Sequence, residues 1–529
     1  MRIKWILAGV TGASVFAAAI AAASPSLQFY TVINEGDPIA GDQFGGAEQV
    51  VVGDGGVVGM VGGLDVSDNL IVIYSTPAAG HVWNSQTVVE SNTNTAVNGL
   101  GANQQFAAFD NLALTSNPSG GTRLTLAAQK QTNESGILQW DDNSGITSLG
   151  DVAFEGDSHG YTQVGHDGTD SGGGTLEMQV NGSGQVLFPA VISTKQSLVR
   201  GDISSLTTVL TSGSPAISDP GSRIALGANN TSASVLNTNT SPAIYTITPS
   251  GGGSSQITSA PTPVSYDPLI GYSSSTGALI VVNGSGPGQQ NLEYVPAGGG
   301  APVQVSTNQF TPGASPLSPP IGEITPGGQI AVYLPDMVLG DTIQHANAVG
   351  GNPAGSVIAS VAGTPQAVAN PATAIALDPS AGPLAIEALQ DPAGATPWVP
   401  QINEVGTTVF NAEIGTSPSD EKKALLDWQG GASPTVVLAV GDDLTIGGQS
   451  VEIDDFTLNQ LVNENDYFKN ALSDDNYLAI SVNYTDLTGP DAGDFGTAVI
   501  ITQLSAVPEP TTLSLGAIAG FGLLARRKR

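Results

Sequence analysis

Short strand-like runs broken by turn residues, with almost no helical periodicity, limit this 529-residue chain to all-β folds. Between residues 24 and 506 the apolar stretches are short, rich in Val, Ile and Thr, and bounded by Gly, Pro, Asn, Asp and Ser. Only Asp420–Asp427 and Thr457–Leu472 have a spacing that predicts short helical turns. We therefore expect an all-β body.

A short unit, Asn-x-x-Gly-x-x-x-apolar, recurs along the body. Asn tolerates turn geometry, Gly takes positive φ, and the apolar residues that follow at alternate positions suit a buried strand. The unit therefore predicts a turn that feeds a strand. Three copies have the Asn and three lack it: Asn117–Leu124, Asn181–Phe188 and Asn403–Phe410, then Gly53–Met60, Ser274–Val281 and Thr325–Val332.

A second recurring piece reads as a strand, a turn and another strand. Loosely regular repetition of such hairpins predicts a β-propeller-like ring of about seven or eight small antiparallel sheets, because closing the ring protects the sheet edges. Two β-sandwich domains divided near Thr311–Pro320 are the alternative. The hairpins start at His81, Gly136, Ser197, Ala243, Asn291, Ser356 and Ala424.

The two ends of the body each supply a single strand. Gln28–Ile33 opens it and Thr497–Gln503 ends it. In a ring of sheets, we expect these two strands to share the last sheet.

The N-terminus, residues 1–23, predicts a signal peptide. Arg2 and Lys4 precede an apolar stretch that ends in Ala21-Ala22-Ala23. Because signal peptidase cuts after small residues, we expect cleavage before Ser24 and a helical signal segment; a retained membrane anchor is the alternative.

The C-terminus, residues 507–529, predicts a membrane-anchoring segment. An apolar run of 13 residues makes a helix of about 20 Å, short for a stable span, and basic residues after it stay on the cytoplasmic side. We therefore expect a transmembrane helix that holds an inner-membrane intermediate. The segment starts with Val507, Pro508, Glu509 and Pro510, continues with the apolar residues Leu513, Leu515, Ile518, Phe521, Leu523 and Leu524, and ends in Arg526, Arg527, Lys528 and Arg529.

The order of Pro-Glu-Pro, short apolar helix and terminal Arg cluster resembles the PEP-CTERM sorting signal. The resemblance implies processing by an exosortase-type sorting enzyme in a bacterium with a Gram-negative-type envelope. It also implies a final place at the cell surface or among exopolysaccharide. It implies nothing about the activity of the body, residues 24–506.

Two of the repeat units, Asn181–Phe188 and Asn403–Phe410, resemble the Asn-x-x-Gly-x-x-Ala-Phe motif of the choice-of-anchor tandem-repeat surface proteins. Both depart from it, with Leu187 and Val409 in place of Ala. The resemblance implies repeats, surface attachment and no characterised chemistry.

The body is strongly acidic, which excludes one class of partner. The chain carries 14 Lys and Arg against 46 Asp and Glu, for a net charge of −32, and six of the basic residues lie at the two ends. Such a charge repels phosphate backbones, so we expect no nucleic-acid partner. There is no Cys, and therefore no disulfide, thiolate metal site or Cys nucleophile.

The sequence offers no catalytic or cofactor motif: a Gly-x-Ser-x-Gly elbow, a His-Glu-x-x-His pair and a Gly-Lys-Ser/Thr loop are all missing. His159, His166, Asp167 and Asp170 crowd a Gly-rich loop, but their spacing matches no ligand code and favours a polar loop. The other two histidines, His81 and His345, are expected at the surface.

Pairs of acids recur in loops that are rich in oxygen ligands. Ca²⁺ accepts six to eight oxygens in flexible geometry, which makes it the one metal such loops suggest. The alternative is that turn-forming Asp and Asn explain most of these residues. The clusters are Asp141-Asp142-Asn143-Ser144-Gly145, Asp442-Asp443, Asp454-Asp455, Asp474-Asp475-Asn476 and Asp486 to Asp494.

Together these features predict an exported, non-enzymatic component of the cell envelope or of an exopolysaccharide matrix. A glycan-binding module is one alternative, and its stacking platforms would come from Trp83, Trp140, Trp398 and Trp428. An extracellular hydrolase or lyase that acts on polysaccharide is the other, because paired carboxylates are plentiful.

Overall fold

The structure is a computed structural model of the full chain. It describes residues 27–504, and between 224 and 324 it describes the strands alone. The other internal gaps are 118–119, 144–145, 166–177, 212–223, 326–327, 335–341, 348–353, 361–384, 390–399, 416–420, 431–433, 459–470 and 489–491. The signal peptide and the C-terminal segment predicted above lie outside the described residues.

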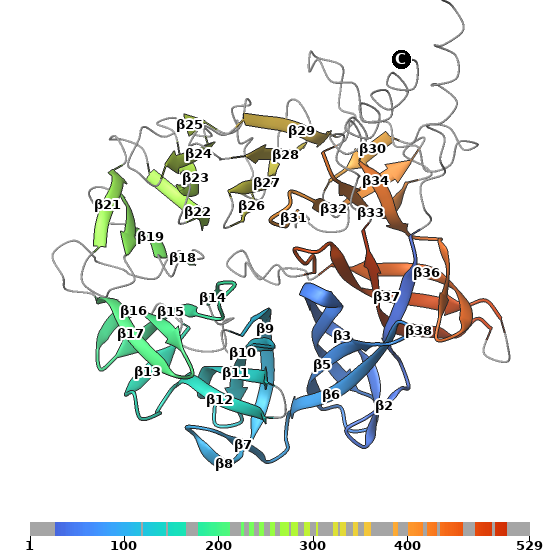
Figure 1. The fold of residues 1–529 in the computed structure, drawn as a ribbon, viewed down its shortest axis with the longest axis horizontal. Coiled ribbons are helices and arrows are strands. Elements are labelled where there is room, and N and C mark those ends of the chain that lie inside the picture. The colour runs from blue at the N-terminus through green and yellow to red at the C-terminus, as the bar shows by residue number, and fades with distance from the viewer. Residues whose placement is uncertain are drawn as a thin grey trace, which may run out of the picture. The chain divides into compact units, whose positions relative to one another are not determined.

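The first half of the described chain forms four antiparallel sheets in chain order (Figure 1). The first contains β2 (Pro38–Ile39), β3 (Asp42–Gly53), β4 (Val57–Leu64), β5 (Leu70–Ala78) and β6 (Val82–Glu90), with the 3-10 turn η1 (Asp54–Gly56) between β3 and β4. The second contains β9 (Phe106–Ser116), β10 (Thr122–Lys130), β11 (Ser135–Asn143) and β12 (Ile146–Phe154). The third contains β13 (Tyr161–Val164), β14 (Gln179–Val180), β15 (Val186–Ile192), β16 (Lys195–Asp202) and β17 (Ser205–Thr211). The fourth contains β18 (Ile224–Leu226), β19 (Ser232–Leu236), β20 (Ala243–Ile247) and β21 (Ser254–Ser259). A separate pair, β7 (Thr95–Val97) and β8 (Gly101–Gln104), lies between the first two sheets in the sequence.

The second half repeats the pattern. The fifth sheet contains β22 (Ser265–Ser273), β23 (Gly277–Asn283), β24 (Gln290–Pro296) and β25 (Val303–Gln304). The sixth contains β26 (Ile321–Ile324), β27 (Gln329–Leu334), β28 (Thr342–Asn347) and β29 (Ala354–Ser360). The seventh contains β30 (Ala385–Ala388), β31 (Gln401–Ile402), β32 (Thr408–Gly415), β33 (Lys422–Trp428) and β34 (Thr435–Ala439). The eighth contains β35 (Asp443–Ile446), β36 (Gln449–Thr457), β37 (Tyr477–Asp486), β38 (Phe495–Gln503) and β1 (Phe29–Asn34).

Each sheet contacts the next one along the chain. The contacts run from β3 to β9, from β12 to β13, from β15 to β18, from β18 to β22, from β22 to β26 and from β26 to β31. Hydrogen bonds join the seventh sheet to the eighth, and β37 of the eighth sheet contacts β3 of the first. The described residues therefore form a closed series of sheets, and the prediction of an all-β body with many small antiparallel sheets is confirmed.

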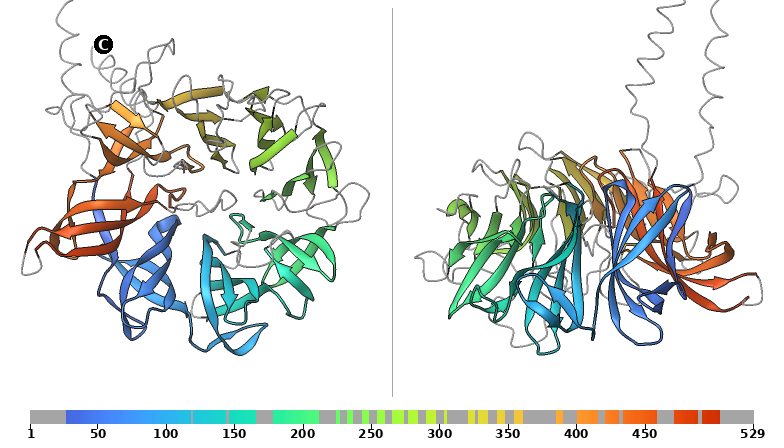
Figure 2. Two further views of the ribbon diagram at one scale, coloured as in Figure 1. Left: turned by 180° about the vertical axis from the view of Figure 1, so that it is seen from behind. Right: turned by 60° about the horizontal axis from the view of Figure 1, so that its bottom comes forward.

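The first and last strands of the body pair with each other, as the sequence predicted. β1 is antiparallel to β38, and its register runs from Phe29 opposite Thr502 to Asn34 opposite Ala498. Figures 1 and 2 show β1, in blue, within the orange-red eighth sheet. Ile33 is 3% exposed and belongs to a hydrophobic core that residues of the first and eighth sheets share.

The repeat units form the same turn at the same place in several sheets. At Asn181 the backbone N–H bonds to the carbonyl of Gln185, and Gly184 N–H bonds back to the carbonyl of Asn181. This turn precedes β15, and the same pair of bonds recurs at the turns that start at Asn117, Thr325, Asn403 and Ser473, before β10, β27, β32 and β37. Gly184 and Gly406 have φ of 73° and 87°, so the glycines of the motif supply the left-handed backbone that the turn requires.

Five of the predicted hairpins, those from Gly136, Ser197, Ala243, Asn291 and Ala424, form as strand pairs. The hairpin predicted from His81 is wrong, because Val82–Glu90 is one strand, β6, that pairs with β5 along its length. The second half of the hairpin from Ser356 lies outside the described residues.

The helical turn predicted over Asp420–Asp427 is also wrong. Lys422–Trp428 is strand β33, paired with β32, and Leu425 and Leu426 are buried in the core. Burial between two strands therefore overrides the local helix preference. Of the turn predicted over Thr457–Leu472, most lies outside the described residues, and Thr457 ends strand β36.

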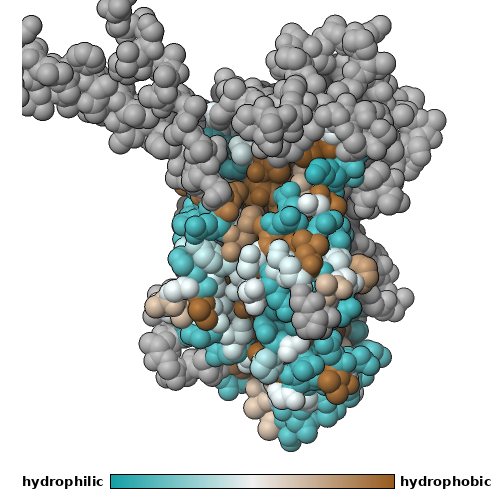
Figure 3. Space-filling model, turned by 90° about the vertical axis from the view of Figure 1, so that its right-hand side faces the viewer, coloured by the Kyte–Doolittle hydropathy of each residue, from teal (hydrophilic) through white to brown (hydrophobic). Residues whose placement is uncertain are grey.

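No helix in the described part of the chain is long and apolar enough to cross a membrane. On the face drawn in Figure 3, the described residues are mostly hydrophilic or neutral, with hydrophobic residues in smaller groups among them. Among the described residues, the exposed large hydrophobic side chains are Val66, Val82, Val405, Leu487 and Phe495.

Candidate functional site

The asparagine of the repeat unit is a buried structural residue. Asn403 is 3% exposed, and its side-chain oxygen accepts a hydrogen bond of 2.9 Å from Thr407 N–H within its own turn. Its amide nitrogen donates to Ser473 O and to Asn476 Oδ1, both at 2.8 Å, in the equivalent turn of the next sheet. The motif thus caps one turn and fastens it to its neighbour.

Acidic residues fasten the next pair of turns. Asp475 Oδ2 accepts a bond of 2.7 Å from Gly55 N–H in the first sheet, and Asp54 Oδ1 accepts one of 3.2 Å from Asp474 N–H in the eighth. Burial raises the pKa of Asp54, and the charges of Asp474 and Asp475 raise it further. Backbone N–H groups therefore offset the repulsion within this cluster.

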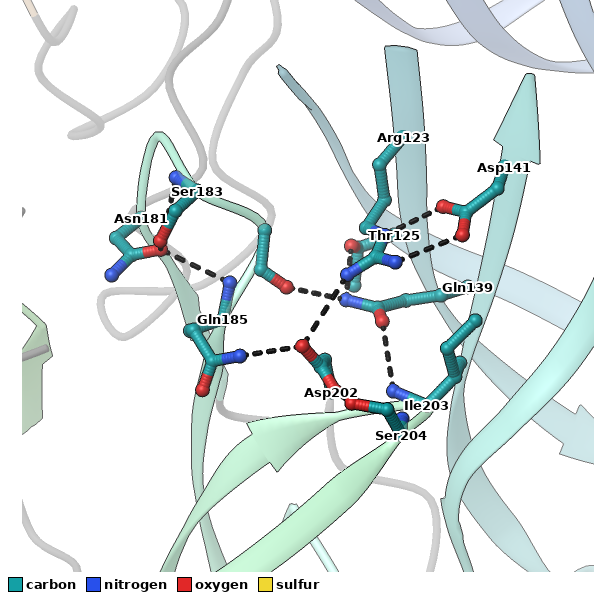
Figure 4. Close-up of polar contacts among 11 residues, drawn as sticks. Arg123, Thr125, Gln139, Asp141, Asn181, Ser183, Gln185, Asp202, Ile203 and Ser204 are labelled. Atoms are coloured by element: carbon teal, nitrogen blue, oxygen red, sulfur yellow. Dashed lines mark hydrogen bonds and ion pairs between the residues drawn. The ribbon is translucent and has the colours of Figure 1, made fainter. Parts of the chain in front are cut away.

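A buried ion-pair network joins the second sheet to the third (Figure 4). Arg123 on β10 donates to both oxygens of Asp141, at 2.6 and 2.8 Å, and its Nη1 lies 3.6 Å from Asp202 Oδ2 on β16. Burial lowers the pKa of Arg123, but its bonds to Asp141 and the charge of Asp202 outweigh that effect and raise it overall. The guanidinium stays charged, with one partner in each sheet.

Gln139 extends this network. Its amide nitrogen donates to Thr125 Oγ1 at 3.0 Å and to Gly184 O at 2.8 Å, and its oxygen accepts a bond of 3.2 Å from Ile203 N–H. Gln139 is fully buried, and Figure 4 shows it between the Asn181 turn and the β16–β17 turn. The arrangement positions strands rather than a ligand.

Most members of the predicted acidic clusters within the described residues bind other parts of the chain. Asp142 accepts from Tyr74 Oη at 3.0 Å, Asp442 from Ala439 N–H at 2.8 Å and Asp454 from Thr485 Oγ1 at 2.7 Å. Asp455 pairs with Lys423 Nζ at 2.8 Å. These contacts support turn formation and packing as the reason for the acids, in place of separate Ca²⁺ loops.

The tryptophans predicted as stacking platforms are mostly packed inside the protein. Trp140 is 4% exposed and contacts Tyr74, and Trp83 is 8% exposed and donates from Nε1 to Gly56 O at 2.9 Å. Trp428 is partly buried against His345, with ring centroids 4.9 Å apart. Trp398 lies outside the described residues.

One of the four histidines occupies a site that differs from the prediction. His345, expected at the surface, is part-buried, shares a bond of 2.9 Å with Gln329, and has a pKa lowered by burial. His81 is exposed, as predicted, and stacks on Tyr30 at 4.1 Å. His159 is exposed, and His166, Asp167 and Asp170 lie outside the described residues.

His159 has neighbours that sequence spacing did not reveal. Asp151, Asp157 and His159 each offer a ligand atom, and these atoms all lie within 4.8 Å of one another. Asp151 lies on β12, and the other two lie in the turn that follows it. His159 Nδ1 lies 2.9 Å from Asp157 Oδ2, and Asp157 is held by Phe154 N–H at 2.9 Å and by His159 N–H at 2.7 Å.

Asp151 is the unusual member of this group. It is 9% exposed, and its Oδ1 has no hydrogen-bond partner among the described residues. Burial and then the charge of Asp157 raise its pKa to about 7, against the opposing charges of His159 and Lys130. A lone Asp in the largely apolar strand β12 (Ile146–Phe154) is the sequence signal that could have revealed this group.

The tail is the part of the chain that a known family matches. The PEP-CTERM protein-sorting motif matches residues 506–529. The chain therefore carries the sorting signal of exported, exosortase-sorted surface proteins. The resemblance of the body to choice-of-anchor repeat proteins stays a prediction, and no curated protein matches the chain.

Several solved structures match this chain at low similarity. Puromycin hydrolase is 11% identical, with a TM-score of 0.36, over 77% of this chain and 58% of that one. A prolyl endopeptidase is 10% identical, with a TM-score of 0.43, over 84% and 55%. The chain thus spans little more than half the length of these two hydrolases. An oligogalacturonate lyase from Vibrio parahaemolyticus is 9% identical, with a TM-score of 0.34, over 78% and 96%. At these identities and TM-scores, the similarity neither supports nor excludes an enzymatic activity for this chain.

Proposed function

We propose that this protein is a surface-displayed, non-enzymatic scaffold of the cell envelope or exopolysaccharide matrix, built on an eight-bladed β-propeller. In this proposal, residues 1–23 are removed by signal peptidase, 24–506 form the propeller, and 507–529 hold the chain at the inner membrane until an exosortase processes it. The sorting motif at the tail carries the proposal.

The use of the polar side chains in the body supports a scaffold. Polar contacts between neighbouring sheets are made by the hydrogen bonds of Asn403 and Gln139 and by the ion pair of Arg123 with Asp202. Such satisfied buried networks rigidify a fold and specify one arrangement of it. The net charge of −32 keeps a Gly-rich β protein soluble and repels neighbouring copies at low ionic strength.

The two alternative functions gain less support. The glycan-binding alternative needs exposed aromatic rings, whereas Trp83 and Trp140 are packed in the core. The hydrolase or lyase alternative needs two carboxylates that face a shared substrate space. Apart from Asp151, the acids described above instead bind backbone N–H groups, hydroxyls or basic side chains.

Replacing Pro508, Glu509 and Pro510 together by Ala is expected to stop sorting while export continues. The apolar run and the basic cluster remain, so the chain stays as an inner-membrane intermediate and is lost from the surface fraction. Fractionation followed by immunoblotting measures this. Replacing Thr511 and Thr512 by Ala is the matched control and leaves surface display unchanged. Equal surface amounts for the Pro-Glu-Pro variant and the wild type would contradict the proposal.

A further inference from the structure

We propose that Asp151, Asp157 and His159 form a binding site for one divalent transition-metal ion of the Zn²⁺ class. The proposal rests on the geometry of the body and is independent of how the protein is sorted. The juxtaposition of three potential ligand atoms within 4.8 Å, two from carboxylates and one from an imidazole, is the first observation.

The unpartnered carboxylate oxygen of Asp151 is the second, independent observation. Asp151 is only 9% exposed, and its Oδ1 has no hydrogen-bond partner in the described part of the chain. A buried carboxylate without a partner costs free energy that a bound cation would offset. Lys130 is near enough to lower the pKa of Asp151, but its ammonium group packs over the Phe154 ring at 4.7 Å and lies 3.9 Å from Glu134.

The surroundings keep the site in place and leave room beside it. Asp151 N–H donates to Asn98 O at 2.8 Å, which holds the β7–β8 segment against this end of β12. Gly99 lies there with φ of 99°, and a Cβ atom at this position would be 3.0 Å from Asp151 Cβ and 3.3 Å from Asp151 Oδ2. Gly99 therefore leaves open the space beside the carboxylate. The His159 side chain is 44% exposed, which gives an ion access from solvent.

The donor set selects the class of metal. Zn²⁺ and similar ions accept a mixture of imidazole nitrogen and carboxylate oxygen, and bind three protein ligands with water in the remaining position. Ca²⁺ prefers six to eight oxygens, and one imidazole in a group of three is a poor match for it. The bond between His159 Nδ1 and Asp157 Oδ2 orients both ligands when no ion is bound.

Calorimetric titration of the purified full-length protein with Zn²⁺, after chelation and dialysis, tests the proposal. The wild type is expected to bind one equivalent of Zn²⁺ at this site much more tightly than its acidic surface binds further Zn²⁺ ions. Asp151→Asn and His159→Gln are each expected to weaken this binding tenfold or more, in line with the loss of a metal ligand. Asp68→Asn is the matched control, because Asp68 is exposed at a φ of 54° that Asn tolerates, and it leaves binding unchanged.

Thermal unfolding with and without Zn²⁺ separates a lost ligand from a damaged fold. Because Asp151→Asn removes a buried charge, the metal-free variant is expected to melt at or above the temperature of the wild type while it loses the rise in Tm that Zn²⁺ produces. Binding that Asp151→Asn and His159→Gln leave unchanged would overturn the proposal. Ca²⁺ binding at this site with the affinity of Zn²⁺ would overturn the choice of metal class.

Discussion

Ile33→Asp is expected to destabilise the body by about 4 kcal/mol or more, because it places an unpaired charge in an apolar core. Ile33 is 3% exposed on β1, and it packs in a core with residues such as Val52 and Val499 from the first and eighth sheets. One substitution at the start of the body thus weakens both its first and its last sheet. Urea unfolding followed by circular dichroism measures the loss.

Val66→Asp is the matched control for this prediction. Like Ile33→Asp, it replaces a β-branched residue with a negatively charged one, but the Val66 side chain is 77% exposed. Exposed substitutions of this kind change the free energy of unfolding by roughly 0.5 kcal/mol or less. Equal destabilisation by the two variants would mean that β1 is not part of the shared core.

Arg123→Met is expected to cost about 3–5 kcal/mol, because it removes one partner of a buried ion pair and leaves the other charge uncompensated. The Arg123 side chain is 7% exposed, and the side chains of Asp141 and Asp202 are 16% and 13% exposed. Methionine keeps much of the side-chain volume, so the loss reports on the charge. The free energy of unfolding of the purified protein is the quantity to compare.

A second substitution shows whether the uncompensated charge causes the loss. Adding Asp141→Asn to Arg123→Met removes one stranded carboxylate and is expected to recover part of the stability. Lys195→Met, which removes a positive charge at an exposed position on β16, is the control and has little effect. If Arg123→Met were as stable as Lys195→Met, the ion-pair network would not stabilise the packing of the second sheet against the third.

The sheets were predictable from the sequence because local turn chemistry marks them. The Asn-x-x-Gly units specify their own turns, with Gly184 and Gly406 at positive φ and the Asn side chain as a cap. The pairing of β1 with β38 was predictable because each end of the body left one strand without a neighbour in sequence. The first inference needs only the local sequence of each turn. The second needs only the rule that the strands of a sheet must pair.

The predictions that were wrong or missing concern residues whose structure depends on partners far away in the sequence. Lys422–Trp428 reads as a helical turn until β32 and β34 flank it, and His81–Glu90 reads as a hairpin until β5 pairs along the whole segment. Arg123 meets Asp202, and Asp151 meets His159, only after strands and turns have folded back on each other. Sequence spacing does not predict such contacts between distant residues. The one indication is a charged residue in an otherwise apolar strand.

Disulfide trapping tests directly whether the body closes on itself through the pairing of β1 with β38. Phe29 lies opposite Thr502, and the chain has no cysteine of its own to compete. Because neighbouring residues of a strand point to opposite faces, Phe29→Cys with Thr502→Cys is expected to form a disulfide, whereas Phe29→Cys with Ile501→Cys is not. The measurement is the yield of the cross-linked peptide in a non-reducing protease digest analysed by mass spectrometry. High yield for the first pair alone is the predicted result; no cross-link, or equal yields for both pairs, would contradict the closed body.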